Sequence, residues 1–219
     1  TPLYSSAASD VYKRQEMHHL HNHLYHTCLS TSGGRAMCHI SCVIFAAKHL
    51  SKEEIAGKKV IEVGSYDVNG SVRPLIQHWN PGVYVGVDIE KGRGVDVICD
   101  AENLVKKFGK ESFDVVISTE LLEHVRDWKS VVSNVKNVCA PNGIILVTTR
   151  SYGYGVHSFP RDFWRYQVED MREIFSDCNI LVLENDFEAP GVFIKAKKPG
   201  EFSERDLSKH RLYSICLLY

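Results

Sequence analysis

The sequence predicts an α/β fold with a doubly wound, mostly parallel sheet. Near the start of the ordered pattern, an apolar strand at Lys59–Val63 is followed by a glycine-containing turn, a helix and a second apolar strand at Val83–Val87. Apolar strands joined by a helix are typical of a parallel sheet that is covered on both faces. Towards the end, Ile180–Leu183 and Val192–Ala196 leave no room for a crossover helix between them. These two strands therefore predict an antiparallel pair.

The remaining elements continue this alternation of strands and helices. Apolar residues at helical spacing predict a leading helix. Three further runs, rich in β-branched residues, predict strands, and a valine stripe predicts a helix between the last two of them. In chain order, the predicted elements are the helix Met37–Leu50, the strands Val95–Cys99 and Phe113–Ser118, the helix Trp128–Val138 and the strand Ile144–Thr148.

The turn after the first strand predicts a ligand site, because such sheets bind ligands at the carboxyl ends of their strands. Its glycines are Gly64 and Gly70, with no glycine midway between them. A dinucleotide fingerprint needs that middle glycine, which lets the backbone approach a pyrophosphate. Asp67 would also repel phosphates. Glu62 and Asp67 instead favour a ligand that carries an amino group and no phosphate.

Asp88 stands at the tip of the second strand, 24 residues after Gly64. A carboxylate in this place can accept two hydrogen bonds from ribose hydroxyls. The alternative is an acid that only caps a strand end.

Six pieces of the chain, in this order and spacing, resemble the class I S-adenosylmethionine (SAM)-dependent methyltransferases. The resemblance covers about residues 37 to 199, and it implies a Rossmann-like seven-stranded, mostly parallel sheet with one antiparallel strand near its C-terminal edge. The sequence departs from the family where Tyr66 and Val68 replace the later glycines of the turn. The six pieces are Glu62-Val63-Gly64-Ser65, Asp88, Cys99-Asp100-Ala101-Glu102, Phe113-Asp114-Val115-Val116, Glu120-Leu121-Leu122-Glu123-His124-Val125 and Pro141-Asn142-Gly143.

The resemblance implies SAM as cofactor and assigns roles to residues at the strand ends. Acids would hold the amino-acid end and the ribose, and the segment after the third strand would read the adenine edge. For that segment, a helix N-cap at Asp100 or Asn103 is the structural alternative. The predicted cofactor-binding residues are Glu62, Gly64, Ser65, Asp67, Gly70, Asp88, Ile89, Asp100, Ala101, Glu102, Ser118 and Glu120.

The loop Thr149–Tyr166, which follows the fifth strand, predicts the acceptor site. It is long, rich in aromatic residues and glycine, and leaves the same edge of the sheet, and long loops in compact domains are more often functional than idle. A hydroxyl acceptor benefits from a base, and a histidine titrates closest to neutral pH. The alternatives are that His124 is a packed residue and that the aromatics fill the core. The predicted catalytic residues are His157, Asp162 and His124, and the predicted substrate-binding residues are Arg150, Tyr152, Trp164, Arg165 and Tyr166.

Composition narrows the class of protein. The chain has 219 residues, 44% hydrophobic and 24% charged, with a formal net charge of −1. This balance gives no reason to expect bulk attraction to nucleic acid or to a membrane, and no apolar run approaches the roughly 20 residues of a spanning helix. The seven cysteines are odd in number and scattered, which favours a reducing, cytoplasmic setting.

The two ends of the chain differ from the predicted domain, residues 37–199. Residues 1–36 have no clear period and are expected to be a non-native or disordered leader, and residues 200–219 a poorly ordered tail. The leader carries five histidines between His18 and His26. A metal-binding tract is one interpretation of them, but no matching cluster follows, so no metal site is predicted.

The sequence therefore predicts a SAM-dependent methyltransferase that acts on a small-molecule acceptor, such as a hydroxyl of a sugar or natural-product scaffold. One alternative is an NAD-dependent or nucleotide-sugar oxidoreductase, against which the missing middle glycine and the terminal strand pair argue. A second is a non-catalytic SAM-binding or partner-binding module. The sequence assigns no oligomeric state.

Overall fold

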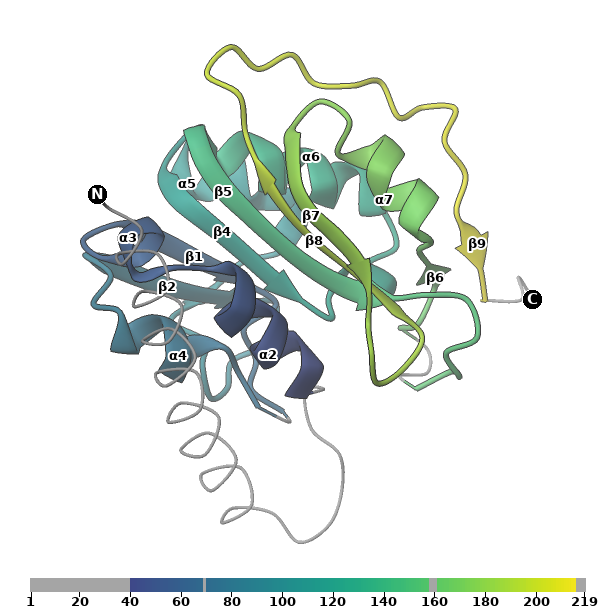
Figure 1. Ribbon diagram of the computed structural model, residues 1–219, viewed down its shortest axis with the longest axis horizontal. Helices are drawn as coiled ribbons and strands as arrows, with labels where there is room; N and C mark the ends of the chain where they lie inside the picture. Colours follow the sequence, from purple (N-terminus) through teal and green to yellow (C-terminus); the bar gives the residue numbers. More distant parts are fainter. Residues whose placement is uncertain (1–39, 69, 158–160, 216–219) are drawn as a thin grey trace, which may run out of the picture. The chain divides into compact units, whose positions relative to one another are not determined.

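The structure is a computed structural model that describes residues 40–68, 70–157 and 161–215 (Figure 1). The predicted leader at 1–36, with its histidine tract, and the last four residues lie outside this part. A sheet of seven strands in the order β3-β2-β1-β4-β5-β8-β7 forms the centre of the described chain. Its strands are β1 Lys59–Val63, β2 Val83–Asp88, β3 Val97–Ile98, β4 Phe113–Thr119, β5 Cys139–Arg150, β7 Asn179–Asn185 and β8 Gly191–Lys197.

The direction of the strands confirms the predicted fold class. β1 pairs in parallel with β2 and β4, β2 with β3, and β4 with β5. β8 lies antiparallel between β5 and β7, so it is the one reversed strand, next to the edge. β7 and β8 form the predicted antiparallel pair.

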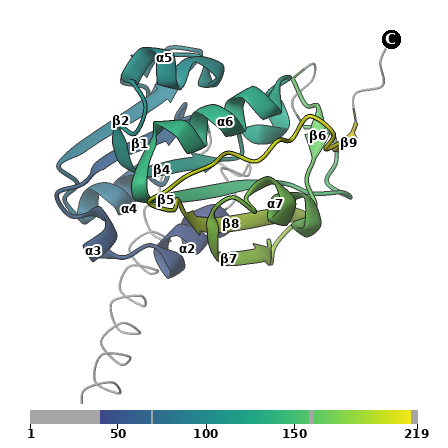
Figure 2. The ribbon, with the colours of Figure 1, turned by 90° about the horizontal axis from the view of Figure 1, so that it is seen from above.

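Helices cover both faces of the sheet (Figure 2). α6 begins at its predicted residue because Asp127 accepts a hydrogen bond from the backbone N–H of Ser130 at 3.1 Å. The helices α5, α6 and α7 pack on one face and α2 and α4 on the other. Their bounds are α2 Ile40–His49, α3 Lys52–Ile55, α4 Arg73–His78, α5 Leu104–Phe108, α6 Trp128–Val138 and α7 Val168–Ile174, with short 3₁₀ helices η1 Ala101–Asn103 and η2 Leu122–His124.

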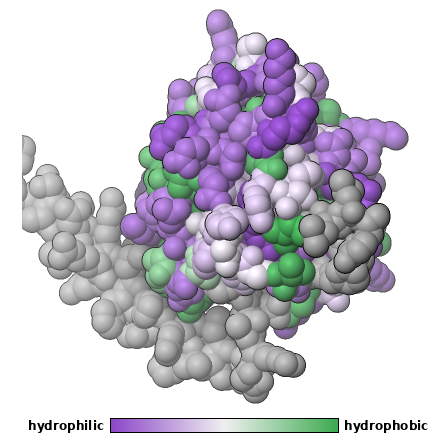
Figure 3. Space-filling view, turned by 90° about the vertical axis from the view of Figure 1, so that its right-hand side faces the viewer, coloured by the Kyte–Doolittle hydropathy of each residue, from purple (hydrophilic) through white to green (hydrophobic). Residues whose placement is uncertain are grey.

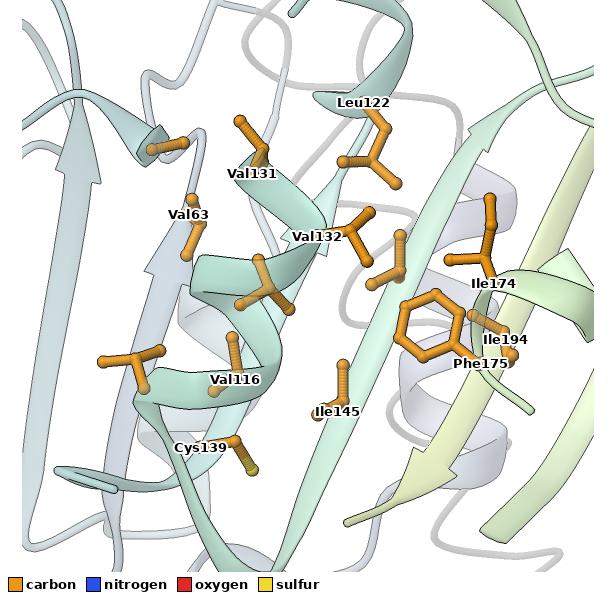
Figure 4. Packing of buried hydrophobic residues seen from close by; sticks show 14 of the residues in the cluster. Val63, Val116, Leu122, Val131, Val132, Cys139, Ile145, Ile174, Phe175 and Ile194 are labelled. Atoms are coloured by element: carbon orange, nitrogen blue, oxygen red, sulfur yellow. The ribbon is translucent and has the colours of Figure 1, made fainter. Parts of the chain in front are cut away.

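The main core lies between the sheet and α6 and α7 (Figure 4). The valine stripe of α6 is buried against strand residues such as Val116 and Ile145. Phe175, just after α7, packs beside Ile145 and Ile194. Because both faces of the central strands are covered, β4 reads as a nearly continuous apolar run rather than an alternating one.

Several element boundaries differ from the prediction, and two of the differences have a cause in the contacts. The sequence places the start of the helix after the first turn at Ser71, but α4 begins at Arg73. The Ser71 hydroxyl accepts the Arg73 backbone N–H at 3.0 Å and so lies before the helix. β5 begins at Cys139 rather than Ile144, since Cys139 already pairs with Phe113 before a shift in register.

Residues 200–215, expected to form a poorly ordered tail, are packed against the domain. The short strand β9, Tyr213–Ser214, pairs antiparallel with β6, Trp164–Arg165. Leu207 is only 7% exposed, and the Ser208 carbonyl accepts a hydrogen bond from Lys129 Nζ at 3.0 Å. This segment therefore returns from the end of β8 to the loop that follows β5 (Figure 1).

The surface in Figure 3 is mostly hydrophilic, with small separate hydrophobic patches. None of the helices in the described residues is long and apolar enough to cross a bilayer.

Candidate functional site

The site lies where the strand order reverses. From β1 the chain first builds outward through β2 and β3, then returns to place β4 and β5 on the other side of β1. In open α/β sheets the crevice at such a reversal is where ligands bind. The turns after β1 and β4 meet there: a Cβ on Gly64 would come within 3.1 Å of Leu121 Cβ.

Gly64 also has a left-handed backbone, with φ of +79°. Both the angle and the contact with Leu121 favour glycine at this position. The nearby loop residues Asp67 and Gly70 have hydrogen-bond or ion-pair partners within the protein. Asp67 Oδ1 accepts the Gly70 backbone N–H at 2.7 Å, and its Oδ2 lies 2.8 Å from the guanidinium of Arg93. Asp67 thus shapes the loop, and its carboxylate already has partners.

Glu62 is buried at the end of β1 and only 2% exposed. The Tyr84 hydroxyl donates to its Oε2 at 2.5 Å, and the Ser71 hydroxyl donates to its Oε1 at 3.2 Å. Burial raises the pKa of Glu62 to about 7, despite these hydrogen bonds. A positively charged group brought near this carboxyl would favour its ionised form.

Asp88 ends β2 with its carboxylate oriented by the loop that follows. Its Oδ2 accepts the Tyr66 N–H at 3.3 Å and its Oδ1 accepts the Glu90 N–H at 3.0 Å. Each oxygen keeps a further lone pair, which can accept from a vicinal diol. Ile89 follows with 48% of its surface exposed, and it offers an apolar surface beside the diol position.

Asp100, Ala101 and Glu102 form the start of η1. Asp100 Oδ1 accepts the Glu102 N–H at 2.9 Å, so the N-cap alternative is realised at Asp100. Burial, and then the neighbouring Asp100 and Asp127, raise the pKa of Glu102. The cap leaves the second oxygen of Asp100 for other partners.

Ser118 and Glu120 differ in what they can offer a ligand. Ser118 is fully buried, and its hydroxyl has no hydrogen-bond partner among the described residues. Glu120 has a left-handed backbone, with φ of +54°. Its carboxylate pairs with Arg150 and accepts from Thr148 Oγ1 at 3.0 Å. Burial and then Glu123 raise the pKa of Glu120 to about 7.

Arg150 is the centre of a buried charge network rather than an exposed group. Besides Glu120, it pairs with Asp186 through Nη1 at 2.9 Å, and Asp186 also accepts from Ser41 of α2 at 3.0 Å. The network joins α2, β5, the turn after β4 and the β7–β8 hairpin. The predicted substrate contact at Arg150 is therefore occupied by protein partners.

The three predicted catalytic residues come together. His157 Nδ1 lies 3.0 Å from Asp162 Oδ2, and His157 Nε2 lies 3.2 Å from His124 Nε2. Burial, and then His124 among the charged groups, lower the pKa of His157, while Asp162 opposes this. The neighbouring Glu123 is 0% exposed, and the sequence analysis gave it no role.

The other predicted acceptor residues divide into interior and surface positions. Arg165 and Tyr166 are fully buried: Arg165 pairs with Asp162 at 2.6 Å, and the Tyr166 hydroxyl donates to Leu122 O at 3.1 Å. Trp164 is half-buried and donates to Val125 O at 2.8 Å. Tyr152 is 62% exposed. Of these four, only Tyr152 and Trp164 present surface to a ligand.

Two open cavities adjoin this loop. One, of about 450 Å³, is lined by Ser151, Tyr152 and the hairpin segment Asn185–Gly191. The second, of about 270 Å³, is lined by residues 126–129, Trp164 and residues 210–212. Sequence reasoning missed both the hairpin and the C-terminal lining, because residues far apart in the chain build each cavity.

The residues at the switch point fit SAM. Gly64 permits close approach of a ligand to the backbone, Asp88 keeps lone pairs for a ribose, and the buried Ser118 hydroxyl lacks a partner among the described residues. The acid at Glu62 suits the ammonium and sulfonium charges of SAM and opposes a pyrophosphate. Fold and site together define a class I SAM-dependent methyltransferase domain, with SAM as its cofactor.

Comparison with known proteins confirms this class. A family model described as "Methyltransferase domain" matches residues 40–188, and the chain belongs to that family. The Parvibaculum lavamentivorans ubiquinone biosynthesis O-methyltransferase is 29% identical over 70 residues, which are 32% of this chain and 27% of that protein. The Mycobacterium ulcerans phthiotriol/phenolphthiotriol dimycocerosates methyltransferase 1 is 31% identical over 122 residues, or 50% of this chain and 43% of that protein.

The chain thus spans less than half the length of these two curated relatives. Among solved structures, the Burkholderia thailandensis 1,6-didemethyltoxoflavin-N1-methyltransferase, with bound 1,6-didemethyltoxoflavin and S-adenosylhomocysteine, aligns with a TM-score of 0.56. The alignment covers 91% of this chain and 92% of that one at 11% identity, a level that supports the shared fold alone.

Proposed function

We propose that the protein transfers a methyl group from SAM to a hydroxyl of a small-molecule acceptor, of the sugar or natural-product type. The observation that carries this proposal is the cluster of Asp162, His157 and His124 beside the site. Their nitrogen and oxygen atoms lie 3.0–3.2 Å apart along the chain of contacts. A methyltransferase needs such groups most when the acceptor must lose a proton.

The cofactor end of the site would use residues at the tips of β1 to β4. Asp88 would accept the ribose hydroxyls, Glu62 would face the positive charge of the amino-acid end, and Ala101 with Ile89 would flank the adenine. When bound, SAM supplies a methyl group already activated on a sulfonium. The protein's main contribution is then positioning, which is worth roughly 7–11 kcal/mol in favourable cases.

The acceptor would enter from the loop after β5. Tyr152 and Trp164 border the two cavities there, and the one beside Tyr152, of about 450 Å³, is within the size range of small-molecule sites. Both curated relatives are methyltransferases, and one is named an O-methyltransferase. These names support a hydroxyl acceptor without specifying which one.

A cytoplasmic location is part of the proposal. Cys99, Cys139 and Cys178 carry buried thiols, and burial raises the pKa of Cys139 and Cys178 to about 12. Buried thiols that stay protonated suit a reducing compartment. The competing interpretation is a domain that binds SAM without transferring its methyl group.

The test has two stages, both on the full 219-residue chain. Calorimetric titration with SAM, S-adenosylhomocysteine and NAD⁺ is compared for the wild type and Asp88→Asn. Loss of a charged hydrogen-bond acceptor costs about 1.5–3 kcal/mol, so we expect roughly 10- to 100-fold weaker binding of both adenosyl ligands. The matched control is Glu201→Gln, an exposed acid beyond the end of β8.

The second stage offers radiolabelled SAM with a panel of sugars and phenolic or hydroxylated metabolites. Label in an acceptor, reduced in His157→Ala at unchanged SAM affinity, supports the proposal. Tight SAM binding with no transfer to any class of hydroxyl acceptor would favour the non-catalytic module. Binding of NAD⁺ alone would overturn the cofactor assignment.

A further inference from the structure

Three side-chain atoms converge beside the acceptor loop: Glu123 Oε1, His124 Nε2 and His157 Nε2. His124 Nε2 lies 3.9 Å from Glu123 Oε1 and 3.2 Å from His157 Nε2. One ligand atom from each of the three residues lies within 4.8 Å of the others. Glu123 and His124 come from η2, directly after β4, and His157 comes from the loop after β5. The fold thus brings together groups that are about 33 residues apart in the chain.

Glu123 is a buried carboxylate whose two oxygens differ in their hydrogen bonds. The carboxylate is 0% exposed, and its Oε2 accepts from Thr149 Oγ1 at 2.8 Å. Its Oε1 has no hydrogen-bond partner elsewhere in the described residues. Leaving a buried carboxylate oxygen unpaired is costly, so this atom calls for a positive charge or a donor. The ring nitrogen Nε2 of His124 lies 3.9 Å from this oxygen.

The contacts on the far sides of the two rings fix their tautomers. His124 Nδ1 lies 2.5 Å from the Arg161 carbonyl oxygen, which can only accept, so Nδ1 carries the proton. His157 Nδ1 faces the Asp162 carboxylate at 3.0 Å and the Gly155 carbonyl at 3.4 Å, which are also acceptors. In the neutral rings, both Nε2 atoms therefore present lone pairs, and these two atoms lie 3.2 Å apart.

Two nitrogen lone pairs and one carboxylate oxygen this close together can share a cation. We propose that Glu123, His124 and His157 bind one divalent transition-metal ion, with zinc as the best match. Zinc–nitrogen bonds of about 2.0–2.1 Å at a tetrahedral angle place the two nitrogens about 3.3 Å apart, close to the observed separation. Two imidazoles and a carboxylate suit zinc and its neighbours better than magnesium, which prefers oxygen ligands alone.

The surroundings match those of a metal centre. Asp162 behind His157, and a backbone carbonyl behind His124, are the outer partners that orient metal-binding histidines. Both rings are partly open to solvent, with 24% and 31% of their side chains exposed. Three protein ligands leave a fourth position on the open side, as in catalytic rather than structural zinc sites.

The proposed metal site does not depend on the proposed function, but the role of the ion in methyl transfer rests on that function. An acceptor hydroxyl at the open position would release its proton to water. The oxygen–carbon bond would then form as the carbon–sulfur bond of SAM breaks, and S-adenosylhomocysteine leaves with that electron pair. The ion would hold the acceptor oxygen and lower the cost of its deprotonation.

The experiment compares metal binding in the full chain and in variants of the three ligands. Protein stripped with a chelator is titrated with Co²⁺, followed by visible absorption, and then with Zn²⁺ in competition. The variants are Glu123→Gln, which keeps the shape and the bond from Thr149, and His157→Ala, on an exposed loop. His78→Ala, an exposed histidine of α4, is the matched control.

We expect the wild type and His78→Ala to hold one more metal equivalent than either ligand variant, with a tetrahedral cobalt spectrum. This difference excludes any contribution of the histidine-rich stretch between His18 and His26, which all four proteins share. Equal stoichiometry and identical spectra in all four would overturn the proposal and assign a shared proton to the two rings. Failure of methyl transfer with intact metal binding would count against the proposed function alone.

Discussion

The buried carboxyl of Glu62 makes the stability of the domain depend on pH in a defined direction. Its pKa is about 7 in the folded protein and about 4.5 for an exposed glutamate. The folded state therefore holds this proton more tightly than the unfolded state. The stabilisation is fully present below pH 4.5 and is lost as the pH rises through 7.

The magnitude follows from the difference between the two pKa values. About 2.5 pH units, at roughly 1.36 kcal/mol each, correspond to about 3 kcal/mol over the full range. Between pH 5 and pH 8 most of this falls within the measurable window, about 2–3 kcal/mol. Glu62→Gln keeps a neutral group of the same shape that can still accept from Tyr84, but it removes the titration.

The assay is urea denaturation of the wild type and Glu62→Gln at pH 5, 6, 7 and 8, without ligand. The free energy of unfolding of the wild type should fall by about 2–3 kcal/mol more than that of the variant across this range. Glu120 and Glu123 also have raised pKa values, but they titrate in both proteins and cancel in the comparison. Parallel pH profiles for the two proteins would refute the reasoning.

Two further changes test the framework around the site. Gly64→Ala should lower the free energy of unfolding by about 1–2 kcal/mol and weaken SAM binding, because φ is +79° and the new Cβ would press on Leu121. Urea denaturation measures the first effect and calorimetry the second. Unchanged SAM affinity would contradict the role of Gly64 in close approach of the ligand. Lys136→Met should lower the free energy of unfolding by about 3–5 kcal/mol, since it leaves Asp177 buried without the Lys136 ammonium now 2.7 Å away. The double variant Lys136→Met with Asp177→Asn should recover part of this loss in urea denaturation. No recovery would argue against the ion pair.

The fold was predictable where local pattern and packing agree. Helix α6 has its predicted bounds because a valine stripe and a capping Asp127 both specify it. The β7–β8 pair followed from the short connection between two apolar runs. The pairing of β6 with β9 left no such trace, because each strand has two residues and their partners are about 50 positions apart.

The candidate site was predictable by position but not by side-chain partner. The strand ends placed Glu62, Asp88 and Glu120 at one edge of the sheet. Which cation each acid meets depends on tertiary structure, so the sequence alone does not reveal the pairing of Glu120 with Arg150. The unpaired oxygen of Glu123 is a property of burial, which the motif around it does not reveal.

The antiparallel contact of β9 with β6 has a practical consequence for anyone who trims or tags this protein. A version cut after residue 199 would retain all seven strands of the main sheet and every residue proposed to touch SAM. It would lack the strand that borders Trp164 and the hydrogen bond from Ile215 N to Phe163 O. Such a version should bind the cofactor normally. If it failed to methylate any compound in an acceptor screen, the cause could be the missing strand β9 rather than an unsuitable compound.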